Sequence, residues 1–134
     1  MTLKRIAALS YTIISLAVIA FQIALAAGAP WGAFAMGGAF PGQFPPALRI
    51  AAIVQSVFLL ALAAVVLARA GVILPGWSRV SGWLIWFIVA FAALGLVLNL
   101  ITPSAGERAI WAPVAFLLLI SSGSVALTRN SEKL

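Results

Sequence analysis

Four long apolar stretches dominate the pattern of hydrophobic and polar positions along this chain. They cover residues 6–27, 47–70, 80–101 and 109–127, and the only charged residues inside them, Arg49 and Arg69, stand close to the ends of one stretch. At about 1.5 Å per residue, a helix of about 18 or more uncharged residues crosses a hydrocarbon core about 30 Å thick. The pattern therefore predicts an all-α membrane protein, a single four-helix transmembrane bundle that comprises residues 1–134.

The composition agrees with a chain that is embedded in a lipid bilayer. Hydrophobic residues make up 65% of the 134 residues, and the mean hydropathy is +1.22, whereas soluble domains contain about 45–50% apolar residues. Four spans leave no room for a separate soluble domain. We expect a multi-pass protein of the bacterial plasma membrane whose first partners are membrane lipids.

The basic residues predict the orientation of the spans. With four antiparallel spans, six of the eight Lys and Arg residues fall on the side of the N-terminus and two on the other, so the positive-inside rule places both termini in the cytoplasm. The net charge of +6 then reflects topology, and we expect no nucleic-acid partner. The stretch 6–27 is longer than the apolar region of a signal peptide, about 7–15 residues, so we expect it to be retained as a span.

The segment 28–46 is the external loop of this arrangement. Its 19 residues include five Gly and four Pro, a density that prevents a long helix or strand. It also carries Trp31 and three Phe residues, which favour the membrane interface or a groove at the mouth of the bundle. We expect either an ordered lid over the outer face or an interfacial hairpin that only anchors the bundle.

Three amides mark a candidate site near the same face. Gln22, Gln55 and Asn99 each lie within about 10 Å of the predicted outer boundary, where polar groups are costly and therefore informative. Charged and aromatic residues accompany them at that boundary, so the candidate ligand-binding residues are Arg49, Gln55, Gln22, Asn99, Glu107, Trp31 and Arg108. In one interpretation they form an outward-facing pocket in which Arg binds an anionic group through its planar fork.

The alternative is that these residues only hold the helices together. Amides hydrogen-bond across membrane helices for about 0.6–2 kcal/mol each, and Ser104 with Glu107 fits a capping box at the start of the fourth span. In both interpretations Arg49 and Glu107 begin spans from the same side, so we expect them to pair. Hydroxyl groups of Ser10, Ser15 and Ser122 either bond their own helix carbonyls or line a narrow polar path.

The chain lacks the residues on which enzymatic catalysis usually depends. The chain has no His and no Cys, and its two carboxylates, Glu107 and Glu132, are predicted to lie on opposite sides of the membrane. A paired acid and base, a Ser-His-Asp triad and a metal site would each miss essential residues. We expect no enzymatic activity, no catalytic residues, no metal and no cofactor.

Two external motifs carry a resemblance. In GAPWGAFAMGG…PGQFPPALRIAAIVQ and LNLITPSAGERAIWAPV, the chain resembles a group of small bacterial four-span integral membrane proteins. The resemblance implies the four-helix architecture and a pair of motifs on the outer face, and it implies no activity.

Two functions follow as hypotheses. The first is binding or transport of a small amphipathic ligand, anionic or lipid-like, at an outward-facing pocket. The second is a structural or accessory subunit that assembles with another membrane protein or with itself. The first requires a concave pocket lined by the amides, and the second requires the amides to satisfy one another.

Overall fold

The computed structural model describes residues 2–128. Within this part of the chain, four helices are long and apolar enough to cross a bilayer, which confirms the predicted four-helix membrane architecture. They are α1 (Leu3–Ala26), α2 (Pro46–Arg69), α3 (Ser78–Ile101) and α4 (Ala105–Leu127).

All four helices begin earlier than the predicted spans, and α1 and α4 do so by three and four residues because their caps lie beyond the charged residues. Thr2 precedes α1, and its hydroxyl oxygen accepts a hydrogen bond of 3.1 Å from the N–H of Arg5. Ser104 precedes α4 and accepts one of 3.1 Å from the N–H of Glu107, so the predicted cap at Ser104 is confirmed. A helix can continue through the interface beyond the apolar length that the bilayer requires.

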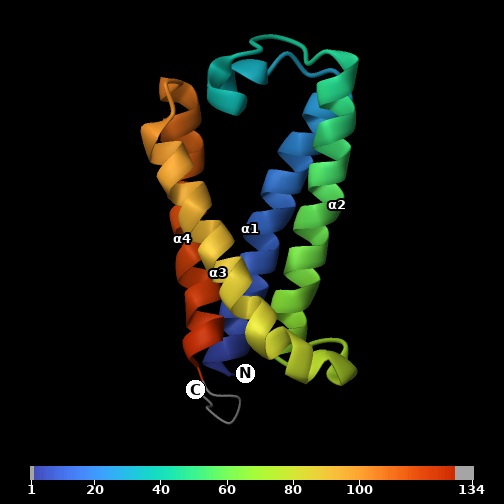
Figure 1. The fold of residues 1–134 in the computed structure, drawn as a ribbon, viewed down its shortest axis with the longest axis vertical. Coiled ribbons are helices and arrows are strands. Elements are labelled where there is room, and N and C mark those ends of the chain that lie inside the picture. The colour runs from blue at the N-terminus through green and yellow to red at the C-terminus, as the bar shows by residue number, and fades with distance from the viewer. Residues whose placement is uncertain (1, 129–134) are drawn as a thin grey trace.

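The helices form two pairs, α1 with α2 and α3 with α4, which converge at one end of the bundle and spread apart at the other (Figure 1). α1 begins and α4 ends at the converging end, which we call the closed end. The chain between α1 and α2 crosses the opposite end, which we call the lid end. α3 packs along α4, α1 packs along α2 and also contacts α4, and α2 has less contact with α3.

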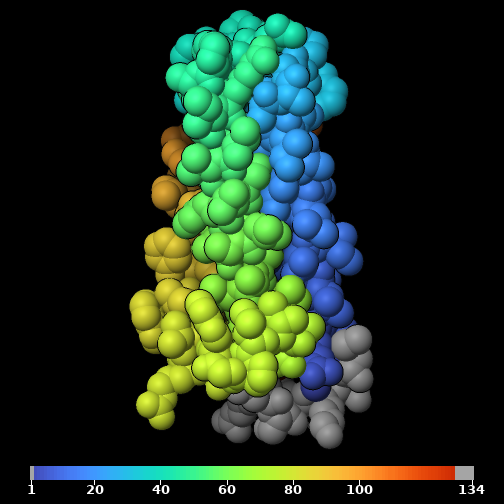
Figure 2. Space-filling view, turned by 90° about the vertical axis from the view of Figure 1, so that its right-hand side faces the viewer, coloured from blue at the N-terminus to red at the C-terminus, as the bar shows by residue number. Residues whose placement is uncertain are grey.

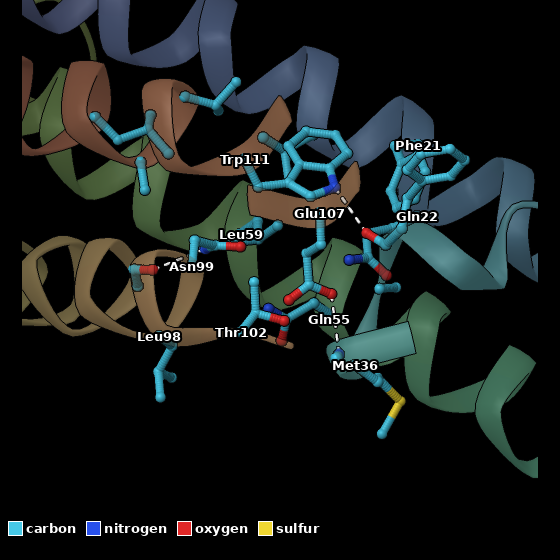
Figure 3. A pocket seen from close by; sticks show the side chains of 18 of the residues that line it. Phe21, Gln22, Met36, Gln55, Leu59, Leu98, Asn99, Thr102, Glu107 and Trp111 are labelled. Atoms are coloured by element: carbon cyan, nitrogen blue, oxygen red, sulfur yellow. Dashed lines mark hydrogen bonds between the residues drawn. The ribbon is translucent and has the colours of Figure 1, made fainter. Parts of the chain in front are cut away.

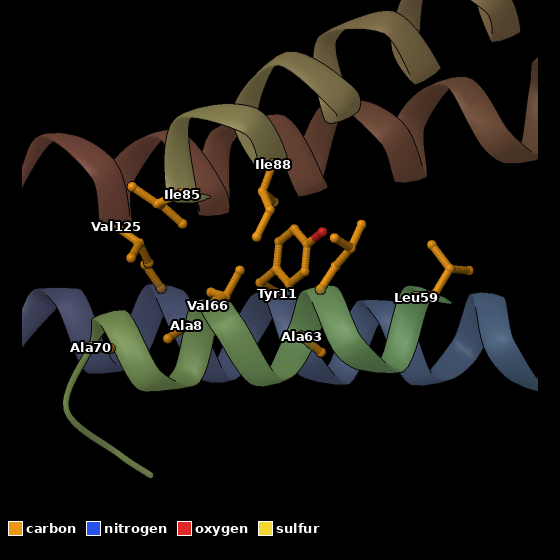
Figure 4. Close-up of a cluster of buried hydrophobic side chains, with 11 residues drawn as sticks. Ala8, Tyr11, Leu59, Ala63, Val66, Ala70, Ile85, Ile88 and Val125 are labelled. Carbon is orange, nitrogen blue, oxygen red and sulfur yellow. The ribbon is translucent and has the colours of Figure 1, made fainter. Parts of the chain in front are cut away.

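The larger of two hydrophobic core clusters lies toward the closed end (Figure 4), and a smaller one at the lid end joins Leu25, Ala52 and Phe44. Val66, Ile85, Ile88 and Val125 are at most 1% exposed and come from α2, α3 and α4. Small side chains from α1, from α2 and from the residue that caps α2 belong to the larger cluster: Ala7, Ala8, Ala63 and Ala70. Because membrane helices gain little from excluding lipid, such close packing of small residues supplies much of the energy that joins them.

Residues 28–45, which we call the lid, fold across the lid end. The lid contains two short 3-10 helices, η1 (Gly32–Phe34) and η2 (Met36–Gly38), and the N–H of Gly32 donates to the carbonyl of Gly42 at 2.9 Å. Figure 2 shows the lid over the ends of α1 and α2, which lie side by side along the face in view. As the density of Gly and Pro predicts, this segment contains no long helix and no strand.

The basic residues that the structure describes divide between the two ends as the predicted orientation requires. At the closed end, Arg5 donates to the carbonyl of Gly71 at 3.1 Å and Arg69 donates to that of Ser78 at 3.1 Å. Both bonds fasten the link between α2 and α3, which contains η3 (Pro75–Trp77). At the lid end lie Arg49 and Arg108; Arg129 and Lys133 lie outside the described residues.

Cysteine labelling tests the orientation, because the chain has no native Cys. Ala39 in the lid and Ser78 at the closed end are both exposed. With the termini in the cytoplasm, a membrane-impermeant maleimide applied to intact cells is expected to label Ala39→Cys and to label Ser78→Cys only after the cells are permeabilised. The reverse pattern would place the lid in the cytoplasm.

Candidate functional site

A cavity of about 770 Å³ occupies the lid half of the bundle. All four long helices and the lid line it, and its volume falls in the range of about 300–1,000 Å³ that is typical of small-molecule sites. Two ring pairs lie between the helices around it: Phe21 and Trp111 with centroids 4.7 Å apart, and Phe58 and Phe91 at 5.4 Å. Small residues at the closed end and rings higher up therefore account for the splayed shape of the bundle.

Each helix contributes one candidate polar side chain to the cavity. Gln22 of α1, Gln55 of α2, Asn99 of α3 and Glu107 of α4 all belong to the lining, and Figure 3 shows them projecting inward from the surrounding helices. The prediction that the amides and Glu107 come together at one end of the bundle is confirmed.

The amides do not satisfy one another. The amide nitrogen of Asn99 donates to the carbonyl of Gly95 in its own helix at 2.7 Å. Among residues 2–128, Gln22 and Gln55 make no hydrogen bond, and both side chains face the cavity. Interhelical bonding between the amides, the alternative derived from the sequence, is therefore absent here.

Glu107 joins α4 to the lid. Its side chain is 8% exposed, and its Oε2 atom accepts a hydrogen bond of 3.0 Å from the N–H of Gly37. Two further bonds run from α4 and its cap to lid carbonyls: the Ser104 hydroxyl donates to Ala33 at 2.8 Å, and the Trp111 indole N–H donates to Phe34 at 2.8 Å. The lid is thus fastened across the cavity from α1 and α2 to α4.

The part of the lid that reaches Glu107 has an unusual backbone. Met36, Gly37 and Gly38 follow one another with φ values of 51°, 68° and 77°. This left-handed conformation suits Gly but costs about 1–2 kcal/mol for a residue with a Cβ atom. The turn directs the N–H of Gly37 toward Glu107 and places Met36 and Gly37 in the lining. The segment is therefore a lid over a cavity and more than an interfacial anchor.

Three of the predicted site residues lie outside the lining. Trp31 stacks on Phe21 with centroids 6.3 Å apart and is 46% exposed. Arg108 is exposed and donates to the carbonyl of Thr102 at 2.7 Å, where α3 ends. Arg49 donates through Nε to the carbonyl of Phe44 at 2.8 Å. Placing these three side chains in the pocket was wrong.

The predicted pairing of Arg49 with Glu107 is also wrong. Within residues 2–128 no ion pair joins them, because Arg49 turns toward the start of its own helix and covers Gly28. Glu107 instead faces Gly37. Backbone groups at the helix end and in the lid are fixed close by, so each charged side chain finds a partner without crossing the cavity.

Trp111 is the main lining residue that sequence reasoning missed. It follows Glu107 by four residues, a spacing that puts both on one face of α4, and Val114, Ala115 and Leu118 continue that face along the cavity. Other missed contributors are Thr102, which is 5% exposed, and Phe44, which is 4% exposed. The helical spacing from Glu107 was a usable signal for Trp111, and the aromatic content of the loop was the signal for Phe44.

Three hydroxyl groups of the closed half have local partners, whereas Ser15 lines the cavity. Ser10, Thr12 and Ser122 donate to the carbonyls of Ile6, Ala8 and Leu118, each four residues earlier in the same helix. Such bonds need no functional explanation. The apolar core fills the closed end between these helices, so the described residues favour the local interpretation over a polar path.

No protein-family model matches the chain, and comparisons with curated proteins and with solved structures find no match. The resemblance carried by the two external motifs stays a prediction. The residues of the site form an apolar cavity with several polar side chains near the lid.

Proposed function

We propose that this protein binds a small amphipathic, lipid-like molecule in the cavity and takes it from the outer leaflet of the plasma membrane. The observation that carries the proposal is the pair of amides, Gln22 and Gln55, which face an apolar cavity without a protein partner. Polar groups in a low-dielectric site are costly when they remain unpaired. A ligand head group that pairs with them removes that cost.

The cavity is placed to receive a ligand sideways. α2 and α3 diverge toward the lid end (Figure 1), and both line the cavity there. Leu94, Leu98 and Ile101 of α3 belong to the lining and are 55%, 52% and 70% exposed. Because these side chains line the cavity and are also exposed on the outside of the bundle, we infer that the cavity opens to the membrane there. The opening lies between the outer halves of α2 and α3.

The polar groups, rather than the apolar walls, account for selectivity in this proposal. An alkyl chain that leaves lipid for an apolar cavity gains little, because lipid tails are as apolar as the walls. Each hydrogen bond to a head group contributes about 1 kcal/mol, and four helices supply such groups. The ligand is therefore chosen by its head group and accommodated by its chain.

Native mass spectrometry of protein released from membranes in a mild non-ionic detergent tests the proposal. We expect one small molecule or lipid per chain, retained at collision energies that strip the surrounding detergent and loosely held lipid. Protein that carries only loosely held lipid, or that is recovered as a complex with another membrane protein and has an empty cavity, would contradict the proposal. The second result would support the accessory-subunit hypothesis instead.

A further inference from the structure

We propose that the cavity selects amphiphiles whose head group is a protonated amine, held between Glu107 and the ring of Trp111. This inference rests on the proposed function and adds the charge of the ligand. It reverses the expectation of an anionic ligand, because that expectation depended on Arg49 and Arg108, and neither lines the cavity.

The charge distribution in the lining is one-sided. Glu107 is the only Asp, Glu, Lys or Arg residue among the described residues that line the cavity, although the chain as a whole carries a net charge of +6. The two basic side chains at the lid end are held on backbone carbonyls, Arg49 on Phe44 and Arg108 on Thr102. No cation in the described lining therefore competes with a cationic ligand for Glu107.

Unused acceptor capacity faces the same space. Glu107 uses Oε2 for the N–H of Gly37, and within residues 2–128 its other oxygen has no donor. Asn99 uses its nitrogen for Gly95, which leaves its oxygen as an acceptor. The amide oxygens of Gln22 and Gln55 have no partner in the described residues. The amide nitrogens of Gln22 and Gln55 also have no partner in the described residues, so the lining offers donors as well as acceptors. An ammonium group has three N–H donors and no acceptor, and the carboxylate of Glu107 is the acceptor that favours it over a neutral head group.

Trp111 supplies the second contact. It lies one helical turn from Glu107 on the same face of α4, and both line the cavity (Figure 3). Its indole N–H is already bonded to Phe34 of the lid, and Phe21 packs against the ring with centroids 4.7 Å apart. The ring is therefore held in place, and a cation has to approach the part of it that Phe21 does not cover. A cation within about 6 Å of such a ring centre is attracted to its face, most strongly where water is excluded.

Three amphiphiles with the same alkyl chain test the head-group preference: dodecylamine, which is protonated at pH 7, dodecanol and dodecyl sulfate. Binding is measured by native mass spectrometry titration of the full chain in a non-ionic detergent. We expect dodecylamine to bind at least about tenfold more tightly than dodecanol, and dodecyl sulfate to bind most weakly.

Glu107→Gln is the decisive variant because Gln keeps an acceptor oxygen for the N–H of Gly37 while removing the charge. We expect the preference for dodecylamine over dodecanol to disappear and the affinity for dodecanol to change by less than about threefold. Arg108→Gln is the matched control: the residue is exposed and outside the lining, so this variant is expected to keep the preference. Hydrogen exchange at the Gly37 amide checks that the lid remains closed in both variants.

The outcomes separate the two proposals. Equal binding of the amine and the alcohol by the wild type, or a preference for the sulfate, would overturn the cationic head group while leaving an amphiphile site in place. A preference for the amine that survives in Glu107→Gln would also overturn it. Binding of none of the three amphiphiles would remove the amphiphile site itself, and with it this inference.

Discussion

Replacing Gly95 with Phe is expected to abolish ligand retention while the bundle stays folded. Gly95 lies in α3 and lines the cavity, and a Cβ atom built on it meets nothing within 4 Å. A Phe ring can therefore enter the space that the ligand would occupy. We expect the fraction of ligand-bound chain in native mass spectra to fall by at least about tenfold. Because Gly is a poor helix former, the free energy of unfolding should change by no more than about 1 kcal/mol.

Gly123→Phe is the matched control for this variant. Gly123 lies in α4, also has nothing within 4 Å of an added Cβ atom, and is absent from the lining. The same substitution there is expected to leave the bound fraction unchanged. Equal retention of ligand by both variants would show that the ligand lies outside the cavity and would contradict the proposed function.

Replacing Gly32 with Ala is expected to open the lid. An added Cβ atom would overlap the carbonyl oxygen of Phe40 and would lie 2.8 Å from that of Gly42. Both neighbours are backbone atoms, so the chain must move, and the bond from the Gly32 N–H to Gly42 is lost. We expect the lid to lose about 3 kcal/mol of local stability, which corresponds to roughly hundredfold faster hydrogen exchange at the Gly37 amide.

Gly76→Ala supplies the control for the lid variant. Gly76 lies in η3 at the closed end, where an added Cβ atom has open space. Exchange in the lid should match that of the wild type in this variant. Unchanged exchange at Gly37 in Gly32→Ala would mean that the lid does not depend on the close approach of residues 32, 40 and 42.

Much of this architecture follows from local properties of the chain. The four spans were predictable because a helix is the form in which a single apolar segment satisfies its backbone in lipid, and because each stretch has the length that a bilayer demands. The cap at Ser104 was predictable because it involves residues three apart. The clustering of Gln22, Gln55 and Asn99 at one end followed from their depth along the spans alone.

Only the tertiary structure decided which of these groups share a cavity. Depth along a helix does not specify the direction of a side chain, so Arg49 and Arg108 appeared equivalent to the amides in sequence but turn to nearby carbonyls in the fold. The cavity itself arises from the packing of small residues at one end and of rings at the other. The contact between Gly37 and Glu107 joins residues 70 positions apart. By itself the sequence determined the spans and the depth of their polar groups, because these depend on neighbours along the chain. The cavity and the lid over it depend on contacts between residues of different helices, and only folding brings those residues together.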